Sequence, residues 1–212
     1  MSIVIATRYT PAPRRSAAET REHVLDVAEQ LFYWDGIRAT GVDRIAREAG
    51  IAPTTLYRSF ASKDDLVAAY VDRYADGYRE WIETLVADPA FTPRDRILAL
   101  LEGLAGATSP DTFRGCPFLM VLAEYPDPAS APHDSAQRVK EWVRGRLRAL
   151  VAELPGVRPR ARTAVADQLA LVVEGLYASV AALGPDGPAA QARTLAALVV
   201  DNASRRPPSR PD

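Results

Sequence analysis

A short polar cluster in the N-terminal third of the chain carries the clearest chemistry in the sequence. Thr54, Thr55, Tyr57 and Arg58 lie within one short segment. Their hydroxyl and guanidinium groups donate hydrogen bonds of the kind that phosphate oxygens and the edges of DNA bases accept. Apolar Leu56 lies between them, so a helix here would have one polar face and one buried face. A helix that enters the major groove of DNA needs this division.

Two short predicted helices position this cluster. The first spans residues 42–49 and stops at Gly50, and the second begins at Pro53, a residue tolerated at the first helical position, and ends near residue 59. Small Ala46 lets the two helices approach closely. The apolar residues that would lock the crossing are Ile45, Ile51, Leu56 and Phe60. This arrangement is typical of a helix-turn-helix, although spacing alone also fits a plain helical hairpin with a polar outside.

Longer helices flank this pair. Ser16 and Glu19 form a capping box that starts a helix over 17–35, and Gly36 supplies its left-handed C-terminal residue. Ser62 starts a fourth helix that runs to about residue 86. At about 1.5 Å per residue it is roughly 35 Å long, enough to connect two domains rigidly.

Helical periodicity continues to the end of the chain, and no alternating β-branched run with hairpin turns interrupts it. Further helices are predicted over 92–106, 117–124, from after the loop 126–132 to about 154, 159–183 and 188–203. The predicted fold is all-α, with an N-terminal three-helix domain that contains the helix-turn-helix and a larger helical domain after it. The predicted divisions are a flexible arm (1–15), the helix-turn-helix domain (16–62), the larger domain (63–204) and a disordered tail (205–212).

Residues 36–66 resemble the DNA-binding domain of the TetR family of bacterial regulators. The family pattern is met by Gly36, Thr40, Val42, Ile45-Ala46, Ala49-Gly50, Thr55-Leu56-Tyr57, Phe60 and Ser62-Lys63. The similarity covers roughly residues 18–70. It implies an all-helical homodimer that binds double-stranded operator DNA through the helix-turn-helix.

The resemblance also implies roles for single residues. Thr55, Tyr57 and Lys63 are expected to touch phosphates, and Thr54 and Arg44 are expected at base edges. The sequence departs from the family pattern at three positions, and these put individual phosphate contacts in doubt while the docking mode stands. The departures are Gly41 and Ala52, both at usual capping sites, and Ser59 in place of a frequent histidine.

The C-terminal part looks like a recurrent subtype of the same family, in the stretch 114–128 and the helices after it. A ligand pocket is expected among the fourth to eighth helices, lined by an apolar set with a few polar groups. The candidates are Trp81, Phe118, Leu119, Trp142, Gln168 and Tyr177. Ordinary core packing is the alternative role for each of them. Cys116 fits either a redox sensor or a small buried hydrophobe.

The helix predicted over 159–183 is apolar on both sides, so it is expected to be buried on both. The helix after it is rich in alanine, which allows close packing, and the pair is expected to form a four-helix interface with a second copy. The candidate interface residues are Leu171, Ala178, Ala182, Ala192 and Ala196.

Composition limits the other functional classes. The single cysteine excludes an internal disulfide. The two histidines are far apart in sequence and there is no phosphate-binding glycine loop, so no catalytic set of residues is recognisable. We therefore expect no enzymatic activity, metal or cofactor. His23 is expected on the outer face of the first helix and His133 in the loop before the seventh. No uncharged run is long enough for a membrane span, and a cytoplasmic protein is expected.

The sequence therefore predicts a ligand-responsive transcriptional regulator, a repressor released from its operator by a small, largely apolar effector. A helical adaptor that binds proteins and not DNA is the alternative.

Overall fold

The computed structural model describes residues 15–108 and 113–205, and this part of the chain is helical, without strands. The helices are α1 (Ala17–Asp35), α2 (Val42–Glu48), α3 (Pro53–Ser59), α4 (Lys63–Leu85), α5 (Pro93–Gly106), α6 (Pro117–Glu124), α7 (Ala131–Glu153), α8 (Pro159–Leu183), the short 3₁₀ helix η1 (Pro188–Gln191) and α9 (Ala192–Ser204).

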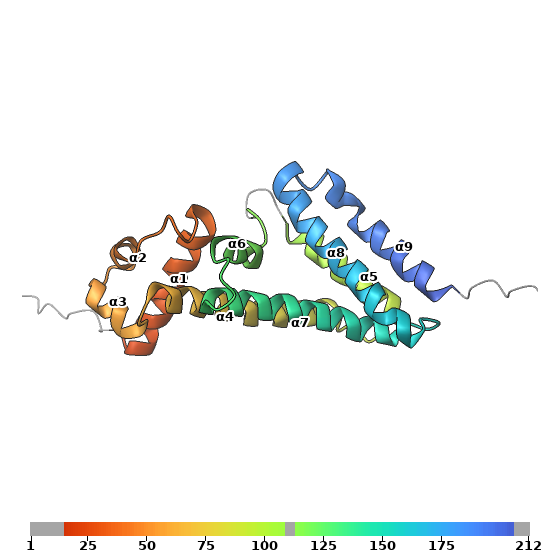
Figure 1. The fold of residues 1–212 in the computed structure, drawn as a ribbon, viewed down its shortest axis with the longest axis horizontal. Helices are drawn as coiled ribbons and strands as arrows, with labels where there is room; N and C mark the ends of the chain where they lie inside the picture. Colours follow the sequence, from red (N-terminus) through yellow and green to blue (C-terminus); the bar gives the residue numbers. More distant parts are fainter. Residues whose placement is uncertain (1–14, 109–112, 206–212) are drawn as a thin grey trace, which may run out of the picture.

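The helices form an elongated molecule with two ends of different kinds (Figure 1). The small helices α1, α2 and α3 occupy one end, and α8 and α9 occupy the other. Along the length between them, α4 packs against α7. Helix α6 packs on α7 and lies between the two ends. The long helix α4 therefore starts at the three-helix end and continues into the larger domain.

Local signals in the sequence set the ends of the helices. The Ser16 hydroxyl accepts the Glu19 N–H at 3.1 Å, and the Glu19 carboxylate accepts the Ser16 N–H at 2.7 Å, which completes the predicted capping box. Gly36 ends α1 with a φ of 94°, a conformation that favours glycine. The predicted bounds of α1, α3 and α8 are confirmed to the residue, and that of α2 to within one residue.

Two predictions about histidines are wrong. His133 lies inside the first turn of α7, because the helix begins at Ala131 and Pro132 fits a helical first turn, where its missing N–H costs no hydrogen bond. The predicted loop 126–132 is accordingly shorter. His23 does not face solvent from α1, since it is half-buried and its Nε2 lies 3.0 Å from the carbonyl oxygen of Ala49.

One side of helix α8 lies in the core of the larger domain, whereas Leu171 on its other side is exposed, so within the protomer the helix is not buried on both sides as predicted. By length and composition alone it is apolar enough to cross a membrane, with a mean hydropathy of 1.3. In this fold it packs against α7, α9 and η1, and Leu169 and Val173 are among its fully buried side chains. The predicted arm and tail lie outside the described residues, apart from Arg15 and Arg205.

Candidate functional site

Helices α1 and α2 pack against α3 and hold it at the end of the molecule. Ile45 of α2 and Leu56 of α3 are fully buried between the helices. The turn between them has Gly50 at a φ of 66°, and the Ile51 N–H donates to the Ala46 carbonyl at 3.0 Å. Thr40 is buried and donates its hydroxyl to the Gly36 carbonyl at 2.8 Å, which fixes the turn before α2. This is helix-turn-helix geometry.

The outer side of α3 is polar. We call Thr54, Thr55, Tyr57 and Arg58 the recognition face. Thr54 and Arg58 are exposed, Thr55 is half-buried, and Tyr57 has 51% of its surface exposed. Arg58 donates to the Thr55 hydroxyl at 3.3 Å, an exposed contact that water or a phosphate can replace. The face therefore presents hydroxyl and guanidinium donors to solvent.

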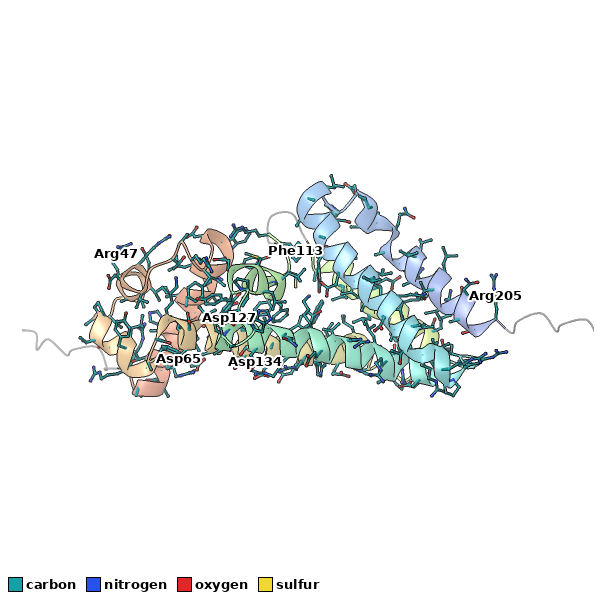
Figure 2. The ribbon with its side chains drawn as sticks, in the orientation of Figure 1. Arg47, Asp65, Phe113, Asp127, Asp134 and Arg205 are labelled. Atoms are coloured by element: carbon teal, nitrogen blue, oxygen red, sulfur yellow. The ribbon has the colours of Figure 1, made fainter. Side chains whose placement is uncertain are left out.

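Two arginines of α2 contact acidic residues. Arg44 forms an ion pair with Asp35 at 2.7 Å, and Arg47 lies 3.4 Å from Glu48 with its side chain 69% exposed. Figure 2 shows Arg47 on the outer side of α2. Ion pairs this exposed contribute about 0–1 kcal/mol, so Arg44 can leave Asp35 at little cost. Arg44 must give up its ion pair with Asp35 before it can contact a base.

Lys63 makes an internal contact. Its ammonium group donates to the carbonyl oxygen of Ile37 at 2.6 Å. Burial lowers the pKa of Lys63, and the nearby Glu124 carboxylate opposes that shift. The side chain thus ties the start of α4 to the turn after α1, in addition to any contact it makes outside the protein.

Helix α6 is fastened to the same turn through Glu124, a contact we call the Glu124 clamp. The Glu124 carboxylate accepts the Ile37 N–H at 3.0 Å and the Arg38 N–H at 2.5 Å, and the Glu124 carbonyl accepts from Arg38 Nε at 2.8 Å. Next to it, Tyr125 donates its hydroxyl to Asp64 of α4 at 3.0 Å. The C-terminal end of α6 is therefore bound to both α4 and the helix-turn-helix domain.

A cavity of about 470 Å³ lies in the larger domain, on the opposite end of α6. We call it the aromatic cavity. Its lining residues come from α1, α4, α6, α8 and the described residues between α5 and α6. They are Glu29, Arg73, Tyr74, Gly77, Tyr78, Trp81, Ala107, Thr108, Phe113, Cys116, Pro117, Phe118 and Tyr177. The volume suits a drug-sized molecule.

Aromatic rings in contact with one another form most of the walls. The Phe118 ring meets the rings of Tyr74 and Tyr78 edge-on, with centroids 5.6 and 5.5 Å apart. Phe113, labelled in Figure 2, stacks on Tyr177 at 5.5 Å. The hydroxyls of Tyr78 and Tyr177 are 3.2 Å apart. Burial raises the pKa of both, and that of Tyr74 to about 12, so all three remain neutral phenols.

Arg73 lines this cavity and Lys140 contacts the lining residue Cys116, and both cations are paired. Arg73 contacts Asp26 at 2.7 Å, Glu29 at 2.8 Å and Glu22 at 3.4 Å. Lys140, behind the wall, contacts Glu174 at 2.8 Å and lies 3.3 Å from Cys116 Sγ. Within residues 15–108 and 113–205, no three His, Cys, Asp or Glu side chains gather as ligands of a metal would.

The far end of the molecule exposes a continuous uncharged stripe, which we call the α8–α9 face. Its large apolar members are Leu171, Leu195 and Leu198, with 72%, 49% and 61% of their surface exposed. Between them lie small or uncharged exposed residues, namely Ala164, Gln168, Gly175, Ala178, Ala182, Gln191 and Asn202. Leucines this exposed, grouped on one face, mark an interaction surface.

Comparison with known proteins agrees with this geometry. A family model for bacterial regulatory proteins of the tetR family matches residues 24–70. Curated helix-turn-helix transcriptional regulators of Staphylococcus aureus are 38% identical over 63 residues, which is 30% of this chain and 34% of each relative. The chain thus spans about a third of the length of the curated relatives it matches.

Solved structures extend the similarity over most of the chain. A TetR-family transcriptional regulator from Streptomyces coelicolor superimposes with a TM-score of 0.82 at 28% identity, covering 89% of this chain and 97% of that one. A second regulator, from Streptomyces avermitilis, gives a TM-score of 0.74 at 27% identity, covering 88% and 99%. The N-terminal domain thus matches the tetR family of bacterial regulatory proteins, and the fold is similar to that of TetR-family regulators.

Within the TetR fold, the predicted DNA-contact residues are brought together only in part. Thr54, Thr55, Tyr57 and Arg58 share one face, as the helical spacing indicated. Arg44 and Lys63, in contrast, are engaged by Asp35 and by the Ile37 carbonyl.

The predicted pocket residues divide evenly. Trp81, Phe118 and Tyr177 line the aromatic cavity. The other three lie elsewhere: Leu119 is on the exposed side of α6, Trp142 packs under the Arg79 guanidinium on α7, and Gln168 lies on the α8–α9 face. Their residue types suit a pocket, but each lies on a side of its helix that does not face the cavity.

Sequence reasoning missed several wall residues of the aromatic cavity. Tyr74 and Tyr78 are four residues apart on α4 and so share one helical face with Trp81. That spacing is the signal that was available. Nothing in the sequence indicated that Glu29 of α1 would meet Arg73 of α4 at the same cavity.

The predicted interface residues need one correction. Ala192 and Ala196 of α9 are buried inside the protomer, with 6% and 0% of their surface exposed, so they pack α9 onto its own domain and are not available to a second copy. Leu171, Ala178 and Ala182 are exposed on the α8–α9 face. An alanine-rich helix has two sides, and composition did not show which one faces inward.

Proposed function

We propose that this chain is a bacterial transcriptional repressor that binds operator DNA as a homodimer and is released by a small effector held in the aromatic cavity. The observation that carries the DNA-binding part is the recognition face. It is polar, exposed and mounted on a helix whose other side is fixed by Leu56. Helices of this kind contact base edges and phosphates from the major groove.

The same geometry supports the proposed domain division. Residues 16–62 form the DNA-binding domain, and residues 63–204 form the domain for the effector and the partner copy. We expect Thr55, Tyr57 and Lys63 at phosphates, and Thr54 and Arg44 at base edges. Arg58, which projects from the same face, supplies a further phosphate or base contact. The protein acts in the cytoplasm, where operator DNA is, and the proposal assigns it no catalytic role.

Dimerisation through the α8–α9 face is part of the proposal. The face exposes Leu171 and Leu198 and carries no charge, whereas the neighbouring charged residues are paired within the protomer, Asp167 with Arg144 and Arg193 with Glu102. Pairing two copies would remove the leucines from water. It would also give two recognition faces, which must lie about 34–36 Å apart to enter successive major grooves.

Effector release is proposed to act through α4 and α6 together. Tyr74, Tyr78 and Trp81 of α4 line the cavity, and α4 starts at the helix-turn-helix domain. Phe118 of α6 lines it too, while the Glu124 clamp at the other end of α6 holds the turn before α2. A ligand that fits only after these helices shift would change the spacing of the recognition faces. Such coupling is typically about 1–3 kcal/mol.

A salt-dependent mobility-shift assay with matched arginine variants tests DNA binding. The duplex is one selected by the wild-type protein from random-sequence DNA. Arg58→Ala should weaken binding and reduce the salt slope by about 1, since one phosphate contact is lost. Arg148→Ala, an equally exposed arginine on α7 at the opposite end, removes the same charge and should change neither. Selection of no duplex, with capture of a protein partner, would favour the adaptor alternative.

A further inference from the structure

We propose that the aromatic cavity takes a flat aromatic molecule bearing a protonated amine, and that the amine pairs with Glu29. The inference rests on the proposed function, because it names the chemical class of the effector. It follows from three features of the cavity: the rings of its walls, the excess of carboxylate at its Glu29 end, and the pairing of the cations beside it.

The walls favour an aromatic guest. Six of the lining side chains are aromatic, namely Tyr74, Tyr78, Trp81, Phe113, Phe118 and Tyr177. Their rings already meet edge-on or stacked at 5.5–5.9 Å between centroids. A planar ring inserted among them makes the same offset and edge contacts, and ring faces also attract a cation.

The Glu29 end of the cavity is negative. Arg73 contacts the three carboxylates of Glu22, Asp26 and Glu29, and Arg21 lies 3.7 Å from Glu22. Two guanidinium groups against three carboxylates leave one negative charge uncompensated in this cluster. Of the three acids, only Glu29 lines the cavity. If a ligand amine takes Glu29, Arg73 keeps Asp26 at 2.7 Å and Glu22. The exchange therefore leaves Arg73 paired.

An anionic guest has no equivalent partner among the described residues at this cavity. Arg73 is held by the three carboxylates, and the Lys140 ammonium is held by both oxygens of Glu174, at 2.8 and 2.9 Å. A carboxylate or phosphate entering the cavity would lose its water without gaining a free cation, which is costly. The neutral hydroxyls of Tyr78 and Tyr177 supply hydrogen bonds but no charge.

Three probes of one size and different charge test the proposal. They are naphthylmethylamine (cationic), naphthylmethanol (neutral) and naphthoate (anionic), titrated calorimetrically into the full-length protein at neutral pH without DNA. We expect the amine to bind about tenfold or more tightly than naphthoate, with the alcohol between them, because the first gains and the last loses Coulomb energy at Glu29.

Matched variants locate the effect. Glu29→Gln should remove most of the preference for the amine and leave the affinity for the alcohol within about twofold. Asp76→Asn removes one charge from an exposed acid of α4 that pairs with Arg79 outside the cavity, and it should leave the order unchanged. Gly77→Leu should weaken all three probes, because Gly77 lines the cavity and a leucine there would occupy part of it. A Cβ added at Gly77 meets no neighbouring atom within 4 Å, so the backbone there accepts a side chain.

The outcomes separate this inference from the proposed function. Tighter binding of naphthoate, no binding of the amine, or an amine preference that survives Glu29→Gln would overturn the inference. Operator binding by the unliganded protein is measured independently, and its absence would overturn the proposed function instead. A probe that binds equally well to Gly77→Leu binds outside the cavity, and the assignment to this site is then wrong.

Discussion

The recognition face and the aromatic cavity differ in how they are built. The recognition face consists of near neighbours on one short helix, with Tyr57 half-exposed and Thr54 in solvent. The cavity collects residues from four helices and a connecting segment, as far apart in sequence as Glu29 and Tyr177, and its rings are packed against one another.

This difference determines how strongly a substitution in each region affects folding stability. An exposed side chain on a fixed helix can be replaced with little effect on folding, usually within about 0.5 kcal/mol. Replacing a packed ring of the cavity leaves a void as well and costs about 3–5 kcal/mol for an aromatic-to-alanine change. Function at the recognition face is therefore separable from stability, whereas at the cavity the two are mixed.

The largest effect is expected when the dimer is broken, because operator binding needs two copies and binding at the cavity needs one. Ala178→Glu places a carboxylate in the middle of the exposed α8 stripe, where two copies would bury it without a partner. Sedimentation should show monomers, and operator binding should fall by about 100-fold or more, since one recognition face alone remains. Binding of naphthylmethylamine should persist, because the cavity lies within one protomer.

Ala152→Glu is the control, an exposed alanine on α7 away from that face. It should remain dimeric and bind DNA normally. If Ala178→Glu were also dimeric, the interface would have to lie elsewhere.

Next in size is the loss of Tyr57. Tyr57→Ala should weaken operator binding about tenfold or more and leave the midpoint of thermal unfolding unchanged, since the side chain is half-exposed. Thr54→Ala should instead change the preference among duplexes that differ at one base pair. Competition assays and thermal denaturation measure both. A large fall in stability with Tyr57→Ala would contradict the separability of the recognition face.

The smallest effect on operator affinity is expected from a change at Lys63, which lies where the helix-turn-helix domain meets α4. We expect Lys63→Ala to lower the affinity severalfold for all sequences and to reduce the salt slope by about 1, as for a phosphate contact. It also removes the hydrogen bond to Ile37, so the free energy of unfolding should fall by about 1 kcal/mol. An unchanged salt slope with the same fall in stability would show that Lys63 only fastens α4 to the turn.

The fold was largely predictable from the sequence because helix ends depend on nearby residues. Ser16, Glu19 and Gly36 define α1 to the residue, and Pro53 starts α3. Where a signal had two meanings the prediction failed: Pro132 was taken as a loop residue but lies in the first turn of α7. The resemblance to the TetR DNA-binding domain rests on the same local pattern, and the family model matches it over residues 24–70.

The cavity was less predictable because it depends on how helices are rotated about their axes. Trp81, Phe118 and Tyr177 were identified by type, but Trp142 and Gln168 have the same character and point elsewhere. A rotation of one residue position, about 100° in an α-helix, moves a side chain from the cavity to the surface. Only tertiary packing decides between these positions.

Reciprocal coupling between the two regions is the central claim. The measurement is the affinity of the dimer for its selected duplex with and without saturating naphthylmethylamine, and its affinity for the amine with and without the duplex. Gly77→Leu, with a blocked cavity, and Glu124→Gln, with a weakened clamp, are measured beside the wild type. We predict the same factor in both directions, about fivefold or more, reduced in Glu124→Gln and absent in Gly77→Leu. An amine that fills the cavity and leaves operator affinity unchanged would contradict the account.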